Sequence, residues 1–239
     1  MSVEWARCGI GGIPAGFHDV YSLVLGSDSH PDVLTHGLGV EWAIMDGYTK
    51  SYACCQNVHS AAEAAISLRP AFIEAGASAQ VSSITVETHP YALPLDNPQP
   101  STTLAAKFSM QHVVAVALMK GQAGVEAFAS ETLASEEVRT LRDKVKLVSF
   151  DPLPGPPNDR PARIVIRMKN GGEVRGECLS AIGGPDRPLD DSLVLEKIVT
   201  LTGVRYPRLA GFVSSWMSFS EPALQQGWSD AVSAFCEAN

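Results

Sequence analysis

The chain has 239 residues, of which 45% are hydrophobic and 18% charged, a composition typical of a globular protein. Its formal net charge is −8, which argues against a non-specific nucleic-acid surface, because such a surface requires a field of positive charge. The five cysteines are odd in number and two of them are adjacent, so we expect a reduced chain without a disulfide framework.

The start of the chain, MSVEWARCGIGGIPAG, lacks the basic residues and the apolar run of a secretory signal. No apolar stretch reaches the roughly 18 residues that span a bilayer. We therefore expect a cytoplasmic protein with no membrane partner and no nucleic-acid partner. The sequence has no CxxC pair, no HExxH motif and no glycine loop with dinucleotide spacing, so we expect no metal and no cofactor.

The first 75 residues are predicted to form a connecting segment that leads into a helix. Residues 1–47 are rich in turn formers and have little periodic apolar surface, so they are predicted to connect rather than to fold alone. A helix is predicted over residues 60–75, because Ser60 and Glu63 have the spacing of a capping box. Pro70 is expected to kink this helix or to end it early.

The middle of the chain predicts a strand and then a buried helix. VSSITVETH, residues 81–89, alternates apolar and polar side chains as a half-buried strand does. Residues 101–121 are predicted to form one helix that ends at Gly121, and its second half, VVAVALM, is expected to be buried. Two interpretations remain open for Lys107 and His112: they need a partner or a ligand in the interior, or they lie at an exposed helix end.

A β-hairpin is predicted over residues 162–179, with its turn at residues 170–172, Asn-Gly-Gly. One face of the hairpin is apolar and the other is charged, so only one side of the sheet is expected to be covered. This pattern indicates an α+β fold, an antiparallel sheet with helices packed on one face and further helices flanking it. The remaining predicted elements are helices at residues 135–144, 190–203 and 220–237 and a strand at residues 145–150.

A candidate site lies just before the first predicted helix, where Lys50, Cys54, Cys55 and His59 fall within ten residues. His59 is expected immediately before the helix N-terminus, whose partial positive charge and free N–H groups favour anions. Lys50, His59 and this helix end would then form a pocket for a carboxylate ligand, with the histidine as proton carrier. The alternative is a solvated lysine, two small buried thiols and a histidine that only packs.

Several motifs together resemble a known family. They are KSYACCQNVH at residues 50–59, PSTTLAAKFSMQH at residues 100–112, the hairpin turn at residues 171–173, the loop GGPDRPL at residues 183–189 and a helix that carries Lys197. The chain resembles the MmgE/PrpD family, which includes 2-methylcitrate dehydratase, cis-aconitate decarboxylase and iminodisuccinate epimerase.

The resemblance implies a domain division and a set of site residues. Residues 45–190 would be an α+β lid domain, residues 1–44 a remnant of a helical domain, and residues 191–239 helices that pack on a helical domain absent from this chain. The active site of the family lies in the cleft between the two domains. The resemblance implies catalytic roles for Lys50, His59 and His112, and substrate-binding roles for Tyr52, Cys54, Cys55, Lys107 and Ser109.

The family chemistry is proton movement at a carbon next to a carboxylate of a di- or tricarboxylic acid. The resemblance therefore implies a lyase, with 2-methylcitrate dehydratase-like activity as the default. The alternatives are an isomerase of the iminodisuccinate epimerase type, a cis-aconitate decarboxylase, and an inactive lid fragment or subunit that needs a helical partner. The implied partners are the carboxylic acid and either a second copy of the chain, in a homodimer, or a separate helical subunit.

Overall fold

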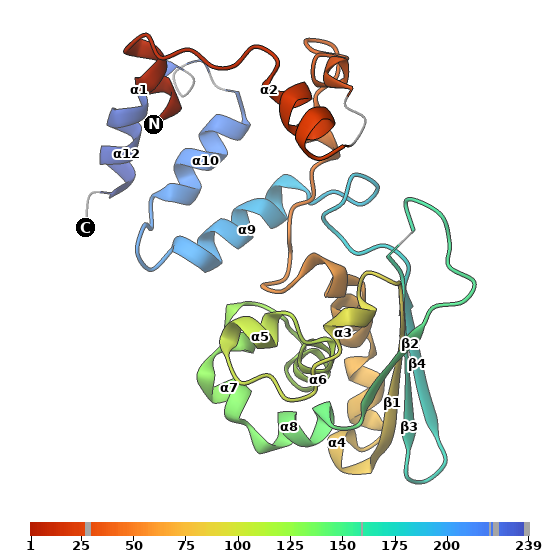
Figure 1. The fold of residues 1–239 in the computed structure, drawn as a ribbon. Coiled ribbons are helices and arrows are strands. Elements are labelled where there is room, and N and C mark those ends of the chain that lie inside the picture. The colour runs from red at the N-terminus through yellow and green to blue at the C-terminus, as the bar shows by residue number, and fades with distance from the viewer. Residues whose placement is uncertain (27–29, 159, 220, 222–224, 237–239) are drawn as a thin grey trace. The chain divides into compact units, whose positions relative to one another are not determined.

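A computed structural model describes residues 1–26, 30–158, 160–219, 221 and 225–236 (Figure 1). The internal contacts divide the chain into two units, Met1–Asp46 and Gly47–Asn239. No described residue of the first unit is buried, so within the described residues this unit has no hydrophobic core of its own. Its helical turns are α1 (Ser2–Arg7), α2 (Gly16–His18), η1 (Asp19–Val24), η2 (Pro31–Leu34) and η3 (Ala43–Asp46).

The second unit is built on a four-stranded sheet in the order β2-β1-β3-β4. Strands β3 (Ala162–Met168) and β4 (Glu173–Cys178) form the predicted hairpin, and β1 (Val81–Thr88) pairs antiparallel with β3. Strand β2 (Val145–Ser149) instead runs parallel to β1, which differs from the antiparallel sheet expected from the sequence. The reason is the helical connection between β1 and β2. It brings the chain back to the end of the sheet at which β1 begins, so β2 runs in the same direction as β1.

The core lies between one face of this sheet and the helices that cover it (Figure 1). The central strands β1 and β3 present Ile84, Val86, Ile164 and Ile166 to that core, and all four side chains are fully buried. On the opposite face, Arg163 of β3 pairs with Glu87 and Glu177 on the neighbouring strands, at 2.6 and 2.7 Å. A sheet that is covered on one side and charged on the other confirms the predicted α+β class.

Helices α3 (His59–Glu74) and α6 (Met110–Lys120) pack against the sheet. The first nine residues of α6 are buried, as its apolar sequence predicts, and the helix ends at Gly121 in the left-handed conformation. The other elements of this unit are η4 (Gln56–Val58), α4 (Ala77–Gln80), η5 (Leu93–Leu95), α5 (Thr103–Lys107), η6 (Val125–Phe128), α7 (Ser130–Ala134), α8 (Glu136–Arg142), α9 (Asp191–Thr202), α10 (Leu209–Met217) and α12 (Trp228–Cys236).

The C-terminal helices agree with the sequence in part. Helix α9 matches the helix predicted at residues 190–203, and the Asp190 carboxylate caps it by accepting a hydrogen bond from the backbone N–H of Leu193, at 2.8 Å. Helix α12 covers the second half of the helix predicted at residues 220–237, and residues 220, 222–224 and 237 of that prediction lie outside the described residues. Helix α10 was not predicted.

The helix predicted over residues 101–121 is broken at residues 108–109 into α5 and α6. Each piece has its own N-cap: the Thr102 hydroxyl accepts a hydrogen bond from the Ala105 N–H at 3.1 Å, and the Ser109 hydroxyl accepts one from the His112 N–H at 3.0 Å. A serine that caps a new helix turns the chain at that point, and the apolar pattern does not reveal it. Lys107 therefore ends α5, whereas His112 belongs to the first turn of α6.

The predicted capping box at the start of α3 is wrong. The helix begins at His59, and no side chain caps it. The Ser60 hydroxyl donates to the backbone carbonyl of Arg160 at 2.7 Å, and the Glu63 carboxylate accepts from the backbone N–H of Ile182 at 2.9 Å. Partners from distant parts of the chain have replaced the local ones. The helix also continues through Pro70 to Glu74.

Replacing Ser109 with alanine is expected to lower the free energy of unfolding by about 1–2 kcal/mol. The buried Ser109 hydroxyl caps α6 and also donates to the backbone carbonyl of Asn97 at 2.5 Å, so both bonds are lost together. Urea denaturation measures the change. Ser135→Ala is the control, because the Ser135 hydroxyl accepts the cap bond of α8 at 3.5 Å; an equal loss in both variants would contradict the assignment.

Candidate functional site

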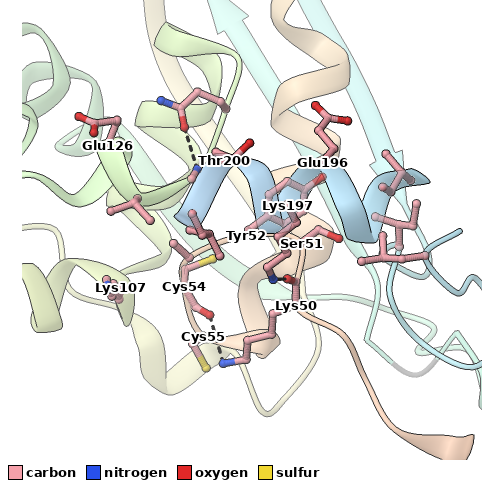
Figure 2. Close-up of a pocket in the computed structure, with 18 of the residues that line it drawn as sticks. Lys50, Ser51, Tyr52, Cys54, Cys55, Lys107, Glu126, Glu196, Lys197 and Thr200 are labelled. Atoms are coloured by element: carbon pink, nitrogen blue, oxygen red, sulfur yellow. Dashed lines mark hydrogen bonds between the residues drawn. The ribbon is translucent and has the colours of Figure 1, made fainter. Parts of the chain in front are cut away.

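A pocket of about 1010 Å³ lies where the loop before α3 meets the 107–108 and 122–126 segments and helix α9 (Figure 2). Of the eight predicted site residues, the pocket is lined by Lys50, Tyr52, Cys54, Cys55 and Lys107. His59, Ser109 and His112 are not among the described residues that line it. The two motifs at residues 50–59 and 100–112 therefore meet at one pocket, although not through all of their residues.

Backbone hydrogen bonds fix the loop that carries Lys50. The N–H of Cys55 donates to the carbonyl of Lys107 at 2.9 Å, which holds the two motifs side by side. The N–H of Ala53 donates to the carbonyl of Ala123, also at 2.9 Å. The Lys50 ammonium folds back over its own loop and donates to the carbonyl of Cys54 at 3.4 Å, as Figure 2 shows.

Five charged side chains line the pocket: Lys50, Lys107, Lys197, Glu126 and Glu196. Within the described part of the chain, no ion pair joins any lysine of this set to either glutamate. Three ammonium groups whose charge is not neutralised by a neighbouring carboxylate can attract an anionic ligand. The pocket therefore has the chemistry of a carboxylate site on its lysine-bearing walls.

The Cys54 thiol and the Tyr52 phenol of the pocket are neutral at physiological pH. Burial raises the pKa of the Cys54 thiol to about 12, and the neighbouring Cys55 adds to this effect. Burial, followed by the charge of Glu63, also raises the pKa of Tyr52 above its usual value. Cys54 is therefore a packing residue in its thiol form, and the Tyr52 hydroxyl is a hydrogen-bond donor rather than a base.

His59 lies behind the pocket, in contact with the rings of Tyr48 and Tyr52 at centroid distances of 5.6 and 5.2 Å. Tyr48 donates its hydroxyl proton to the carbonyl of Ile182 at 3.0 Å, so its oxygen accepts from Nδ1–H of His59 at 3.3 Å. No described group lies in hydrogen-bonding geometry with Nε2 of His59. Burial lowers the pKa of His59 to about 4, against the opposing effect of the Cys54 backbone, so the ring is neutral at pH 7.

Lys50, His59 and the start of α3 were expected to form one pocket, but the structure places only Lys50 there. His59 is the first residue of the helix and is only 1% exposed, so the helix start faces the interior and does not line the pocket. The ring of Tyr52 connects the two, because Tyr52 both lines the pocket and contacts His59.

His112 is a fully buried residue of the core. Its Nε2–H donates to the carbonyl of Ala127 at 2.9 Å, and its Nδ1 accepts from the guanidinium of Arg142 at 3.2 Å. Burial, followed by the charge of Arg142, lowers the pKa of His112, which keeps the ring neutral. Both ring nitrogens are used and Ser109 serves as a helix cap, so the geometry gives these two residues structural positions.

Three charged residues of the pocket were not predicted as site residues: Glu126, Glu196 and Lys197. Lys197 belongs to α9, and its ammonium donates to the backbone carbonyl of Lys50, 147 residues earlier in the sequence. A lysine between Glu196 and the apolar pair Ile198 and Val199 is a weak sequence signal. The family resemblance includes this helix, but spacing alone does not bring it to the Lys50 loop.

No helix among the described residues has the length and apolar character needed to cross a membrane. Within the same residues, no three histidine, cysteine, aspartate or glutamate side chains gather as metal ligands would.

Comparison with protein-family models matches residues 52–211, more than half of the chain, to the MmgE/PrpD C-terminal domain. The chain belongs to the MmgE/PrpD family. The matched range begins two residues after Lys50 and ends within α10, so it includes the sheet, its covering helices and α9. Most of the residues that line the pocket lie within this range, but Lys50 and Ser51 precede it.

Among curated proteins, this MmgE/PrpD chain is similar to the cis-aconitate decarboxylase-like protein oryM of Aspergillus oryzae (strain ATCC 42149 / RIB 40). The two are 26% identical over 174 residues, which cover 70% of this chain and 36% of the relative. The chain therefore spans little more than a third of the length of that relative.

Proposed function

We propose that this chain forms the carboxylate-binding wall of an MmgE/PrpD-type lyase, which moves a proton at the carbon next to a carboxylate of a di- or tricarboxylic acid. One observation carries the proposal: Lys50 and Lys107, from the two motifs, line the same pocket and have no carboxylate partner among the described residues. Family membership supports the substrate class.

The proposed mechanism uses the lysines as electrostatic groups. Their ammonium groups neutralise the carboxylates of the bound acid. They also stabilise the negative charge that develops when a base supplied by the helical partner takes the proton from the neighbouring carbon. The neutral hydroxyl of Tyr52 donates a hydrogen bond to the same ligand. We propose that His59, neutral and in contact with Tyr52, orients that ring rather than meeting the substrate itself.

Decarboxylation of cis-aconitate is the first reaction to test, because the curated relative is described as cis-aconitate decarboxylase-like. The test supplies cis-aconitate, 2-methylcitrate and iminodisuccinate in turn and follows CO₂ release, dehydration and epimerisation. Turnover of any one of these acids identifies the reaction. No turnover of any acid, with and without a helical partner, would favour the reading of an inactive lid.

A helical partner is part of this proposal. No described residue of α9 or α10 is buried, and Val199, Leu201 and Val204 of this region are more than half exposed. An apolar surface of this kind is typical of an interface. Since the chain spans 36% of the relative, we propose that a helical domain, in the same chain, in a separate subunit or in a second copy, covers this surface.

Replacing Lys50 with alanine is expected to weaken citrate binding at least about ten-fold, because a charge-assisted hydrogen bond contributes about 1.5–3 kcal/mol. Isothermal titration calorimetry of the chain with citrate measures the change. In an active assembly the same variant should also lower kcat/KM.

Lys146→Ala is the matched control, because Lys146 is an exposed lysine of β2 that does not line the pocket. It removes the same charge from the chain and is expected to leave the citrate affinity unchanged. Equal affinities for Lys50→Ala and for the unaltered chain would remove Lys50 from the site. Equal losses in both variants would mean that citrate responds only to the net charge.

A further inference from the structure

The ammonium of Lys197 is held at the wall of the pocket by a backbone group. It donates to the carbonyl of Lys50, and this is the hydrogen bond that joins α9 to the 50–55 loop within the described residues. An ammonium has three N–H donors, so this contact leaves two for a ligand. A side chain already fixed in place loses little conformational entropy when a ligand binds.

The position of Lys197 on α9 separates it from the acidic residue beside it. Successive residues of a helix point about 100° apart, so Lys197 and Glu196 face different directions. In Figure 2 the Glu196 side chain points away from that of Lys50, whereas Lys197 reaches the Lys50 backbone. The third cation of the pocket therefore lies on the side of the Lys50 loop.

The three lysines come from three separate parts of the fold. Lys50 lies in the loop before α3, Lys107 ends α5, and Lys197 lies in the middle of α9. The Cys55–Lys107 and Lys197–Lys50 contacts connect these parts into one wall. Three ammonium groups on one pocket suit a ligand with three carboxylates better than one with two.

We propose that Lys197 is a substrate-binding residue that recognises a third carboxylate, so that the pocket selects tricarboxylic over dicarboxylic acids. The inference rests on the proposed function, since it names the substrate class of the same pocket. The electrostatic surroundings support it: the positive charges of Lys50 and, after it, Lys197 both act on His59 and help to lower the pKa of its ring, so both charges act on the same region.

The test compares two acids that differ by one carboxylate, tricarballylate and glutarate, in binding to the whole chain by calorimetry. The unaltered chain is expected to bind tricarballylate about ten-fold more tightly than glutarate. Lys197→Met should reduce this ratio to about one and leave the glutarate affinity within about three-fold. Lys197→Arg, which keeps the charge and the donors, should preserve most of the ratio.

Further variants keep the result interpretable. Lys197→Gln retains an amide donor without the charge, so it should lose the preference even if Lys197→Met is poorly folded. Lys146→Met, outside the pocket, should leave the ratio unchanged. An unchanged ratio in both Lys197→Met and Lys197→Gln would overturn the inference and leave the proposed function standing. Failure of the unaltered chain to bind either acid would overturn both.

Discussion

Replacing Gly183 with alanine is expected to lower the free energy of unfolding by about 3 kcal/mol, through strain and the loss of a backbone contact. Gly183 has φ +111°, a conformation that L side chains rarely adopt. A Cβ atom at this position would lie 2.0 Å from the carbonyl oxygen of Thr49. That oxygen belongs to the backbone, so the two segments must separate and break the bond from the Thr49 N–H to the Gly183 carbonyl, at 2.8 Å.

Two control variants separate the causes of this loss. Gly171→Ala has the same kind of strain, with φ +86°, but no atom lies within 4 Å of the added Cβ. Gly155→Ala has neither the positive φ nor a close neighbour. Thermal or urea unfolding should rank the losses with Gly183 largest, Gly171 at about 1 kcal/mol and Gly155 smallest. Equal losses for Gly183 and Gly171 would show that the contact with Thr49 contributes nothing.

The same variant is expected to disturb the pocket, because Lys50 follows Thr49 directly in the chain. Ile182 lines the pocket, and its carbonyl accepts a hydrogen bond from the Tyr48 hydroxyl. Together with the bond from the Thr49 N–H to the Gly183 carbonyl, this contact joins the 48–50 and 182–184 segments at two adjacent points. Gly183→Ala should therefore weaken citrate binding more than Gly171→Ala does. A weaker binding of citrate by Gly183→Ala would show that the loop GGPDRPL, residues 183–189, helps to position the pocket for its ligand.

The sequence predicts those features of the fold that depend on local pattern. The alternation in residues 162–168 and the Asn-Gly turn fix the hairpin, because side chains two residues apart face the same side of a strand. The apolar run of α6 predicts its burial, and the acidic start of α9 matches its cap at Asp190. Such patterns act over a few residues and need no knowledge of the tertiary contacts.

Features that depend on distant partners could not be predicted in this way. Glu63 has the spacing of a capping box but binds Ile182, 119 residues later in the sequence. The direction of β2 depends on where the intervening helices return the chain. The break at Ser109 is a local feature, yet a serine within an apolar run fits both a continuous helix and a new cap.

The candidate site also combines features that local sequence patterns predict with features that depend on distant partners. The spacing of Lys50, Tyr52, Cys54 and Cys55 and the family resemblance selected residues that do line the pocket. The resemblance implies a catalytic role for His112, but the helix break and the Arg142 guanidinium, 30 residues away in sequence, hold it in the core. Sequence patterns thus identify which residue types gather, whereas burial decides which of them face a ligand.

The burial of His59 has a consequence for stability against pH. Its pKa is lowered to about 4 in the folded chain, mainly by desolvation, while the unfolded value is about 6.5. Between these two values the unfolded state binds more protons, so the free energy of unfolding rises with pH across this window. Stability from the neutral ring is fully present above pH ~6.5 and is lost progressively toward pH ~4, a change on the order of 3 kcal/mol.

His59→Asn is expected to flatten the rise in unfolding free energy between pH ~4.5 and ~6.5, since asparagine does not titrate and its amide can donate to the Tyr48 oxygen in place of Nδ1–H. Urea denaturation at steps of pH measures the slope. Part of the slope should remain, because burial also lowers the pKa of His112 and acts in the same direction. His36→Asn, at an exposed histidine, is the control and should keep the full slope. An unchanged slope in His59→Asn would mean that the His59 ring is protonated in the folded chain or reached by water, which would return it to the list of groups able to exchange a proton with the ligand.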